Sequence, residues 1–458
     1  MNPELQRNLW LEASPKKLAW VGMVLAVIYG AALVIGGSAN EQGLLARALS
    51  ISGAGVFAVS AFFWGPRVAG RAVGNEVMQR TWDFQRLSVL TPWEMTVGKL
   101  AGATSASWLA ALSGLLVANT GLTMGVAGTG GRPAFWWSLA ALGGGVLLQA
   151  GAMAMALVGV RRARADGRPP ALKLGWGNGV GALLLISVMG RTVPGLGSAG
   201  LGSLPLGGHV WWGIYIGQTR LFAITLTVFA VWAVIAAWRL MRLELQMQNR
   251  PWAWPGFLVF ASVYLAGFAV DRGAAHGWAA ASMVCGLGAY ASAFAEPADR
   301  VRLRRWVEAV RTLDWPRIYL TVPAPWSALK LGALAVLGFM LTAGTLLPGQ
   351  TLARMDSGAL ALAALAGFAF VVRDVGVIAY FRFGPRSRRG DFGAVLGLFL
   401  LYFVGGLVGN ALGGPAGASL FVPTPGKAMV SVFSGAVMAA IAWGLAWSRI
   451  RAPERTES

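Results

Sequence analysis

Residues 18–37 read LAWVGMVLAVIYGAALVIGG, a run of 20 residues without a charged side chain. A helix of this length extends about 30 Å, which is the thickness of the hydrocarbon core of a bilayer. Similar runs recur along the 458 residues, of which 56% are hydrophobic and 12% charged, whereas soluble domains carry about 25% charged residues. The sequence therefore predicts an all-α, polytopic integral membrane protein. The short alternating strands that a closed membrane barrel requires are not evident.

The apolar runs predict twelve membrane-spanning helices. Their approximate ranges are 18–37, 45–64, 100–120, 135–160, 172–190, 210–238, 254–270, 276–295, 328–347, 358–381, 392–412 and 428–447. The 63 glycines suit the close packing of membrane helices, because small residues let two backbones approach each other.

The distribution of basic residues predicts the orientation of the chain. The formal net charge is +20, which in a soluble protein would indicate nucleic-acid binding. In a membrane protein, Lys and Arg instead gather in cytoplasmic loops. With the N-terminus in the cytoplasm, thirty of the 38 basic residues fall in cytoplasmic segments and seven in external ones. We therefore expect both termini in the cytoplasm of a bacterial cell, a multi-pass location in its inner membrane, and no nucleic-acid partner.

Several residue pairs recur at an offset of 233 positions. These pairs are Arg71 and Arg304, Trp82 and Trp315, Pro92 and Pro325, and Trp93 and Trp326. Each lies in the loop after the second span of a six-span half, which predicts an internal repeat with halves at 1–250 and 251–458. An even number of spans per half makes the copies parallel. The second half, with its cytoplasmic loop at 297–327, is degenerate, because Ser327 stands where the first half has Glu94.

Hydrolytic and metal-dependent chemistry is not expected in this chain. A phosphate-binding loop requires G-x-x-x-x-G-K-[ST], but Gly98-Lys99 is followed by Leu and Gly426-Lys427 by Ala. The only histidines are His209 and His276, and no cysteine pair exists. We therefore expect no enzymatic activity, no metal site and no cofactor.

A polar insert separates the second and third apolar runs. Residues 75–99 read NEVMQRTWDFQRLSVLTPWEMTVGK. Glu76 and Arg80 form an i, i+4 pair with the acid first, which favours a short helix. Thr91, Pro92 and Glu94 predict a helix start, with Thr91 as the N-cap, Pro92 at the first helical position and Glu94 closing a capping box. From composition alone, an ordinary cytoplasmic connection is the alternative.

The insert resembles the loop between spans 2 and 3 of type-2 ABC exporter permeases. That loop reads roughly E-R-x-x-G-T-x-E, then T-P-L-S-x-x-E, then G-K. The matching positions are Glu76, Arg80, Thr81, Trp82, Asp83, Thr91, Pro92, Glu94, Gly98 and Lys99. The N-terminal residues 2–10, NPELQRNLW, are similar to the N-P-x-L-x-x-E-L opening of such permeases, with Asn8 in place of the usual Glu. The family usually has six spans per chain, so the second half is poorly covered.

The resemblance implies a function and a partner. In such permeases the N-terminal segment is an interfacial elbow helix, and the first internal loop docks on a separate ATPase. We therefore expect a permease subunit of an ATP-driven exporter, with Glu76–Asp83 as docking segment and Thr91–Lys99 as the turn into span 3. The chain would act either as a homodimer or as a single-chain pseudo-dimer. A second, weaker docking loop would use Glu308, Trp315, Pro325 and Trp326.

Two alternatives remain open from the sequence. One is a secondary transporter with parallel repeats, and the other is a non-transporting membrane scaffold or regulator whose basic loops hold anionic lipids of the bilayer. A secondary transporter should have ionisable residues near the membrane midplane. Asp374 lies well inside an apolar run, next to Arg373. Either the tenth span leaves the membrane there and both groups reach cytoplasmic water, or they form a polar lock between spans.

Overall fold

The computed structural model describes residues 2–37, 42–78, 90–125, 132–165, 208–247, 249–345, 357–384 and 390–451. In this part of the chain, ten helices are long and apolar enough to cross a membrane. These helices are Pro15–Gly37, Gly43–Val77, Ser105–Met124, Ala134–Arg164, Gln218–Glu244, Ala274–Ala295, Ala324–Thr342, Ser357–Arg382, Gly390–Ala418 and Pro425–Arg451. The chain is therefore a helical, multi-pass integral membrane protein.

Each of these ten helices coincides with one of the twelve predicted spans. The fifth predicted span, 172–190, lies outside the described residues. The seventh, 254–270, is shorter than expected, because helix α11 (Ala253–Ala266) has only 14 residues. At 1.5 Å per residue it extends about 21 Å, which is less than a hydrocarbon core of about 30 Å. The count of twelve spans and the position of the termini stay predictions.

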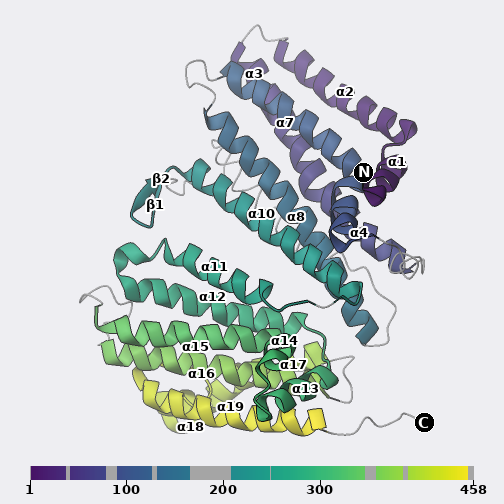
Figure 1. Ribbon diagram of the computed structural model, residues 1–458. Coiled ribbons are helices and arrows are strands. Elements are labelled where there is room, and N and C mark those ends of the chain that lie inside the picture. The colour runs from purple at the N-terminus through teal and green to yellow at the C-terminus, as the bar shows by residue number, and fades with distance from the viewer. Residues whose placement is uncertain are drawn as a thin grey trace. The chain divides into compact units, whose positions relative to one another are not determined.

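The chain folds as two compact units, Met1–His209 with Tyr215–Asn249, and Val210–Ile214 with Arg250–Ser458. The first unit contains α1 (Pro3–Glu12), α2 (Pro15–Gly37), α3 (Gln42–Phe57), η1 (Ala58–Trp64), α4 (Gly65–Met78), α6 (Pro92–Val97), η2 (Gly98–Gly102), α7 (Ser105–Gly125), α8 (Arg132–Ala165) and α10 (Gln218–Glu244). The second contains α11, η3 (Val270–Arg272), α12 (Ala274–Ala295), α13 (Arg300–Arg311), α14 (Trp315–Thr321), α15 (Ala324–Thr342), η4 (Ala343–Thr345), α16 (Ser357–Arg382), α17 (Gly390–Phe399), η6 (Leu400–Val404), α18 (Gly405–Ala418), η7 (Pro425–Lys427) and α19 (Ala428–Arg451). Figure 1 labels most of them.

In the first unit, α3 packs between α2 and α7, while α4 and α10 pack on α8 (Figure 1). The contact between α3 and α7 depends on glycine. A Cβ on Gly53 would lie 2.3 Å from the backbone nitrogen of Ala118, and one on Gly114 would lie 2.7 Å from the carbonyl oxygen of Gly53. The two backbones thus meet directly, as small residues allow in membrane helices.

The second unit has a corresponding succession of contacts. Helix α12 packs against α11 and α15, and α16 packs against α15, α17 and α19. Three of these contacts follow the same order along the chain as contacts in the first unit. The pairs α11 with α12, α12 with α15 and α16 with α19 match α2 with α3, α3 with α7 and α8 with α10. The parallel orientation of the two halves stays a prediction.

A short hairpin precedes α10 and was not expected from the sequence. Strands β1 (His209–Trp211) and β2 (Ile214–Ile216) pair through a turn at Trp212 and Gly213, both of which have positive φ. The predicted sixth span, 210–238, therefore begins eight residues late, at Gln218. The apolar residues of the hairpin suit a strand as well as a helix, and only Gly213 favours the turn.

Helices α3, η1 and α4 form one continuous helix that is longer than a membrane is thick. Its 35-residue candidate span, Gly43–Val77, extends about 52 Å, roughly 20 Å more than the hydrocarbon core. The excess at the α4 end carries Arg67, Arg71 and Glu76. At this end α4, α6, α8 and α10 share a buried apolar cluster that includes Val73, Met95 and Met241.

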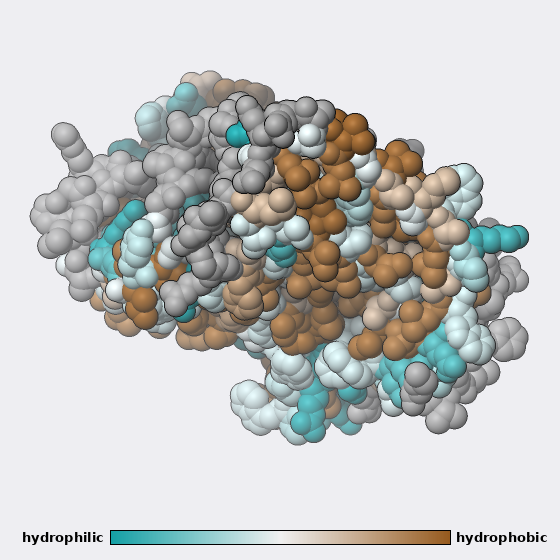
Figure 2. All heavy atoms as spheres, turned by 90° about the horizontal axis from the view of Figure 1, so that it is seen from above, coloured by the Kyte–Doolittle hydropathy of each residue, from teal (hydrophilic) through white to brown (hydrophobic). Residues whose placement is uncertain are grey.

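Much of the remaining surface is apolar. The face drawn in Figure 2 carries large apolar areas bordered by hydrophilic residues. Helix α2 illustrates the composition, because Trp20, Val27 and Val34 are more than half exposed. Exposed side chains of this kind are stable against lipid tails but not against water.

Candidate functional site

Helix α1 is amphipathic in the reverse of the usual sense. Its two buried residues, Glu4 and Asn8, are polar and lie one turn apart, whereas Leu9, Trp10 and Leu11 are exposed. A helix in water buries its apolar face, so this arrangement suits a helix that faces lipid or an interface with Trp10. A helix is therefore present at the N-terminal segment, and its place at the membrane interface stays a prediction.

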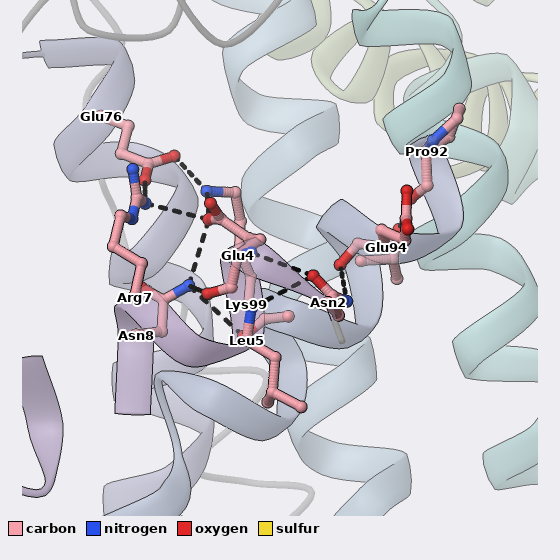
Figure 3. Close-up of polar contacts among 11 residues, drawn as sticks. Asn2, Glu4, Leu5, Arg7, Asn8, Glu76, Pro92, Glu94 and Lys99 are labelled. Carbon is pink, nitrogen blue, oxygen red and sulfur yellow. Dashed lines mark hydrogen bonds and ion pairs between the residues drawn. The ribbon is translucent and has the colours of Figure 1, made fainter. Parts of the chain in front are cut away.

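The polar face of α1 binds a cluster of charged residues from two other elements, which we call the α1 cluster (Glu4, Arg7, Glu76 and Lys99; Figure 3). The ammonium of Lys99, 1% exposed, donates to Glu4 Oε1 at 2.7 Å and also to Glu76. Arg7 donates to both carboxylates, at 2.9 Å from Glu4 and 2.5 Å from Glu76. Two cations and two carboxylates therefore balance one another, with Lys99 and Glu4 buried and Arg7 at the exposed edge of the cluster.

The asparagines of α1 complete its attachment. Asn2 caps the helix by accepting from the backbone nitrogens of Glu4 and Leu5, and its Nδ2 donates to the carbonyl of Glu94 at 2.7 Å. Asn8 Nδ2 donates to Glu4 Oε1 at 3.1 Å and to the carbonyl of Gly98 at 3.4 Å. The amide of Asn8 thus donates a hydrogen bond to Glu4. The Glu that such permeases usually have at this position could not do so as a carboxylate.

Two glycines give α1 a flat surface to lie on. A Cβ on Gly98 would lie 2.7 Å from Glu4 Cγ and 2.9 Å from the backbone nitrogen of Leu5. A Cβ on Gly102 would lie 2.7 Å from Asn8 Cβ. Both glycines belong to η2, a π-helical turn that leads into α7, and π-helical turns are frequent at functional sites.

The predicted helix start at Thr91 is confirmed. Thr91 Oγ1 accepts from the Glu94 backbone nitrogen at 3.2 Å, and Glu94 Oε2 accepts from the Thr91 backbone nitrogen at 2.9 Å, which is a capping box with Pro92 in the first turn. Hydrogen bonds from the backbone and the hydroxyl of Thr91 hold the pKa of the Glu94 carboxyl below its ordinary value. The box fixes α6 at the end of the polar insert.

The structure thus assembles part of the predicted docking region around α1. A stretch of this region lies outside the described residues. Before it lies Glu76, and after it lie Thr91, Pro92, Glu94, Gly98 and Lys99. That stretch includes Arg80, Thr81, Trp82 and Asp83, so the expected pair of Glu76 with Arg80 is also outside. Among the described residues, Glu76 binds Arg7 and Lys99, which are remote in sequence and could not be paired with it from spacing.

The second predicted docking loop separates into an exposed and a packed part. Glu308 and Trp315 are exposed, the latter by 71%. Pro325 lies in the first turn of α15, and Trp326 packs between Trp306 and Trp443 at centroid distances of 5.2 and 4.9 Å. Glu308 and Trp315 are therefore exposed, Pro325 and Trp326 are only partly exposed, and a docking role for the four residues stays a prediction.

A second buried charged group lies in α16, and we call it the α16 cluster (Arg373, Asp374, Tyr290 and Tyr402). Both charged residues are 1% exposed and pair directly, with Arg373 Nε 2.8 Å from Asp374 Oδ1. Asp374 Oδ2 accepts from Tyr290 of α12 at 2.5 Å and from Tyr402 of η6 at 2.7 Å. The cluster links three helices, and protein encloses Arg373 and Asp374, whereas Tyr290 and Tyr402 are partly exposed. Enclosed charges favour the polar lock over the exit to cytoplasmic water, the two alternatives that the sequence left open.

Irregular backbone lies beside the α16 cluster. Gly413 and Gly414 interrupt α18, and the following segment places the carbonyl of Phe421 3.0 Å from Arg373 Nη1. The carbonyl of Ser419 accepts from Ser431 and Ser434 of α19. Non-helical backbone at membrane depth is tolerated where protein groups satisfy it, as here.

Sequence reasoning missed Glu4, Arg7, Gly102, Tyr290 and Tyr402 as site residues. Glu4 and Asn8 are polar and lie one turn apart, but Gln6, Arg7 and Glu12 lie on the same helix, so the sequence did not distinguish the two buried residues. No signal marked the tyrosines. Comparisons with protein-family models, with curated proteins and with solved structures gave no match for this chain.

Proposed function

We propose that this chain is the membrane-spanning permease subunit of an ATP-driven exporter of the ABC type, coupled to a separate ATPase at Glu76–Asp83. The observation that carries the proposal is the α1 cluster. Its ion pairs join α1 to Glu76 on one side of the polar insert and to Lys99 on the other. The resemblance of the insert and of residues 2–10 to such permeases supports the same function.

The cluster suits the transmission of force. A partner that moves the insert would displace Glu76 at the end of α4 and, through Lys99, the π-helical turn at the start of α7. Because both side chains also bind α1, the displacement would reach α1 and the α2 helix that follows it. Buried charges cannot separate without a large cost, so the three elements would move together.

A double variant tests the docking. We expect that Trp82→Ala with Asp83→Ala loses the ATPase that co-purifies with the intact chain in mild detergent, while membrane insertion stays normal. A matched control, Trp212→Ala with Asp271→Ala, removes an exposed tryptophan and an exposed aspartate elsewhere in the chain. Retention of the ATPase by both double variants, or its absence from the unaltered protein, would contradict the proposal.

A second candidate function is a secondary transporter, which the α16 cluster favours. Ionisable groups within membrane spans and interrupted helices are typical of substrate and coupling-ion sites in such carriers. Its prediction is a chain that purifies without any ATPase. The Arg373–Asp374 pair is neutral overall and fully hydrogen-bonded at the carboxylate, which suits a structural lock better than a site that takes up protons.

A further inference from the structure

A groove of about 410 Å³ opens at the start of α2 in the first unit. Glu12, Lys16, Lys17 and Trp20 line one side, and Trp64 of η1 and Ala106 of α7 line the other. Its volume lies in the range of about 300–1,000 Å³ that is typical of small-molecule sites. The ion pairs of the α1 cluster lie outside its lining.

The groove carries a net positive charge. Lys17 Nζ lies 3.1 Å from Glu12 Oε2, so that cation is partly neutralised. Lys16 is exposed and forms no hydrogen bond or ion pair with any other residue that the structure describes. Helix α2 begins at Pro15, and the partial positive charge of its first turn adds to that of the lysines. The ligand that fits this charge is an anion.

The groove also continues into an apolar surface. Trp20 is 66% exposed one turn beyond the lysines, and Met23, Val24 and Val27 of α2 are exposed further along. Tyr29 then meets Ser113 of α7 at 3.2 Å, which closes the space between the two helices. Lysine followed by tryptophan and then by aliphatic residues matches the headgroup, glycerol and acyl regions of a membrane leaflet.

We propose that this groove binds one anionic phospholipid. Its phosphate lies between Lys16 and Lys17, its glycerol region lies against Trp20 and Trp64, and its acyl chains follow the exposed face of α2. A soluble phosphate would satisfy the lysines but would leave the tryptophans and the apolar face uncovered. The bound lipid would hold the joint between α1 and α2 at the membrane surface.

The test is lipid binding by the purified full chain, measured by native mass spectrometry. The probes are phosphatidylglycerol and phosphatidylcholine with identical acyl chains. Removing both charges in Lys16→Gln with Lys17→Gln should weaken phosphatidylglycerol binding by roughly five- to thirtyfold, because each basic residue contributes to attraction of an anionic lipid. Phosphatidylcholine binding should not change.

Two further variants separate this result from misfolding or a general charge effect. Lys330→Gln with Lys427→Gln removes two exposed lysines outside the groove and should leave phosphatidylglycerol binding unchanged. Glu12→Gln removes the competing carboxylate and should strengthen binding, which no folding defect would do. Equal binding of the two lipids, or an equal loss in both lysine pairs, would overturn the proposal. Full displacement of the lipid by inorganic phosphate would identify a site for soluble anions instead.

Discussion

Lys99 places a buried ammonium at the start of a membrane-spanning helix, between two carboxylates that come from α1 and α4. A cation in this position is stable only while both partners remain, because water cannot replace them. The α16 cluster obeys the same rule, with Arg373 and Asp374 each neutralising the other. In both places, removal of one partner should cost far more than removal of the pair.

Lys99→Met leaves Glu4 and Glu76 with only the partly exposed Arg7 as counter-ion. It should therefore destabilise the chain by about 3–5 kcal/mol, the usual cost of removing one partner from a buried ion pair. The free energy of unfolding in detergent measures this. The control is Lys330→Met, which removes an exposed lysine and should change stability by less than about 0.5 kcal/mol. In Lys99→Met with Glu4→Leu, part of the loss should be recovered. Equal stability of Lys99→Met and Lys330→Met would contradict the ion-pair account.

The α16 cluster predicts a graded series. Asp374→Ala leaves Arg373 without its counter-ion and should cost about 3–5 kcal/mol. Tyr290→Phe and Tyr402→Phe each remove one hydrogen bond to a carboxylate and should cost about 1.5–3 kcal/mol. Unfolding measurements of the three variants check the order. A milder effect of Asp374→Ala than of Tyr290→Phe would indicate that the carboxylate is not held as described.

At the scale of elements, the sequence predicts helices well where the signal is local. The capping box at Thr91 and ten of the spans follow from composition and spacing within one turn or one run. The hairpin at 209–216 and the early end of α11 could not be predicted from the sequence, because apolar strands and short buried helices resemble membrane spans in composition. The partners of Glu76 and Lys99 could not be read either, since tertiary packing brings α1 to them across 69 and 95 residues.

The seating of α1 on η2 gives an element-scale prediction. Gly98→Ala places a methyl group against Glu4 and the backbone of Leu5, so α1 should detach more often. Overpacking of about 1–3 kcal/mol corresponds to roughly five- to 150-fold faster hydrogen exchange of the α1 amides. Gly55→Ala is the control, because its Cβ would meet no atom within 4 Å. Unchanged exchange in Gly98→Ala would mean that α1 does not lie on Gly98 in the membrane.

The capping box gives a pH prediction. Because the folded pKa of Glu94 is depressed, its contribution to α6 is present above the ordinary value of 4.5 and is lost as pH falls through the lower folded pKa. In a ¹³C-carboxyl titration, Glu94 should have a midpoint below 4.5, and Thr91→Ala should return it towards that value. If Thr91→Ala leaves the titration midpoint of Glu94 unchanged, the hydrogen bonds with Thr91 are not the cause of its depressed pKa.

At the scale of the whole molecule, the proposed function requires an energy source outside a membrane protein of two compact units. The first unit carries the α1 cluster and the insert that resembles a docking loop, whereas in the second the corresponding residues are partly packed inside. The two halves would therefore engage a partner unequally. The prediction of two halves came from the offset of 233 residues. The prediction of an ATPase partner came from the resemblance to permeases, because helix packing within one chain does not identify a partner.

The central claim is that an ATPase contacts the insert, and site-specific photocrosslinking in intact membranes tests it most directly. A photoreactive phenylalanine analogue replaces Trp82 in one variant and Trp212 in a control variant. We predict that position 82 forms one predominant adduct with a protein that contains a nucleotide-binding ATPase domain, and that position 212 does not. Adducts at position 82 with lipid alone, or the same protein adduct from both positions, would contradict the account.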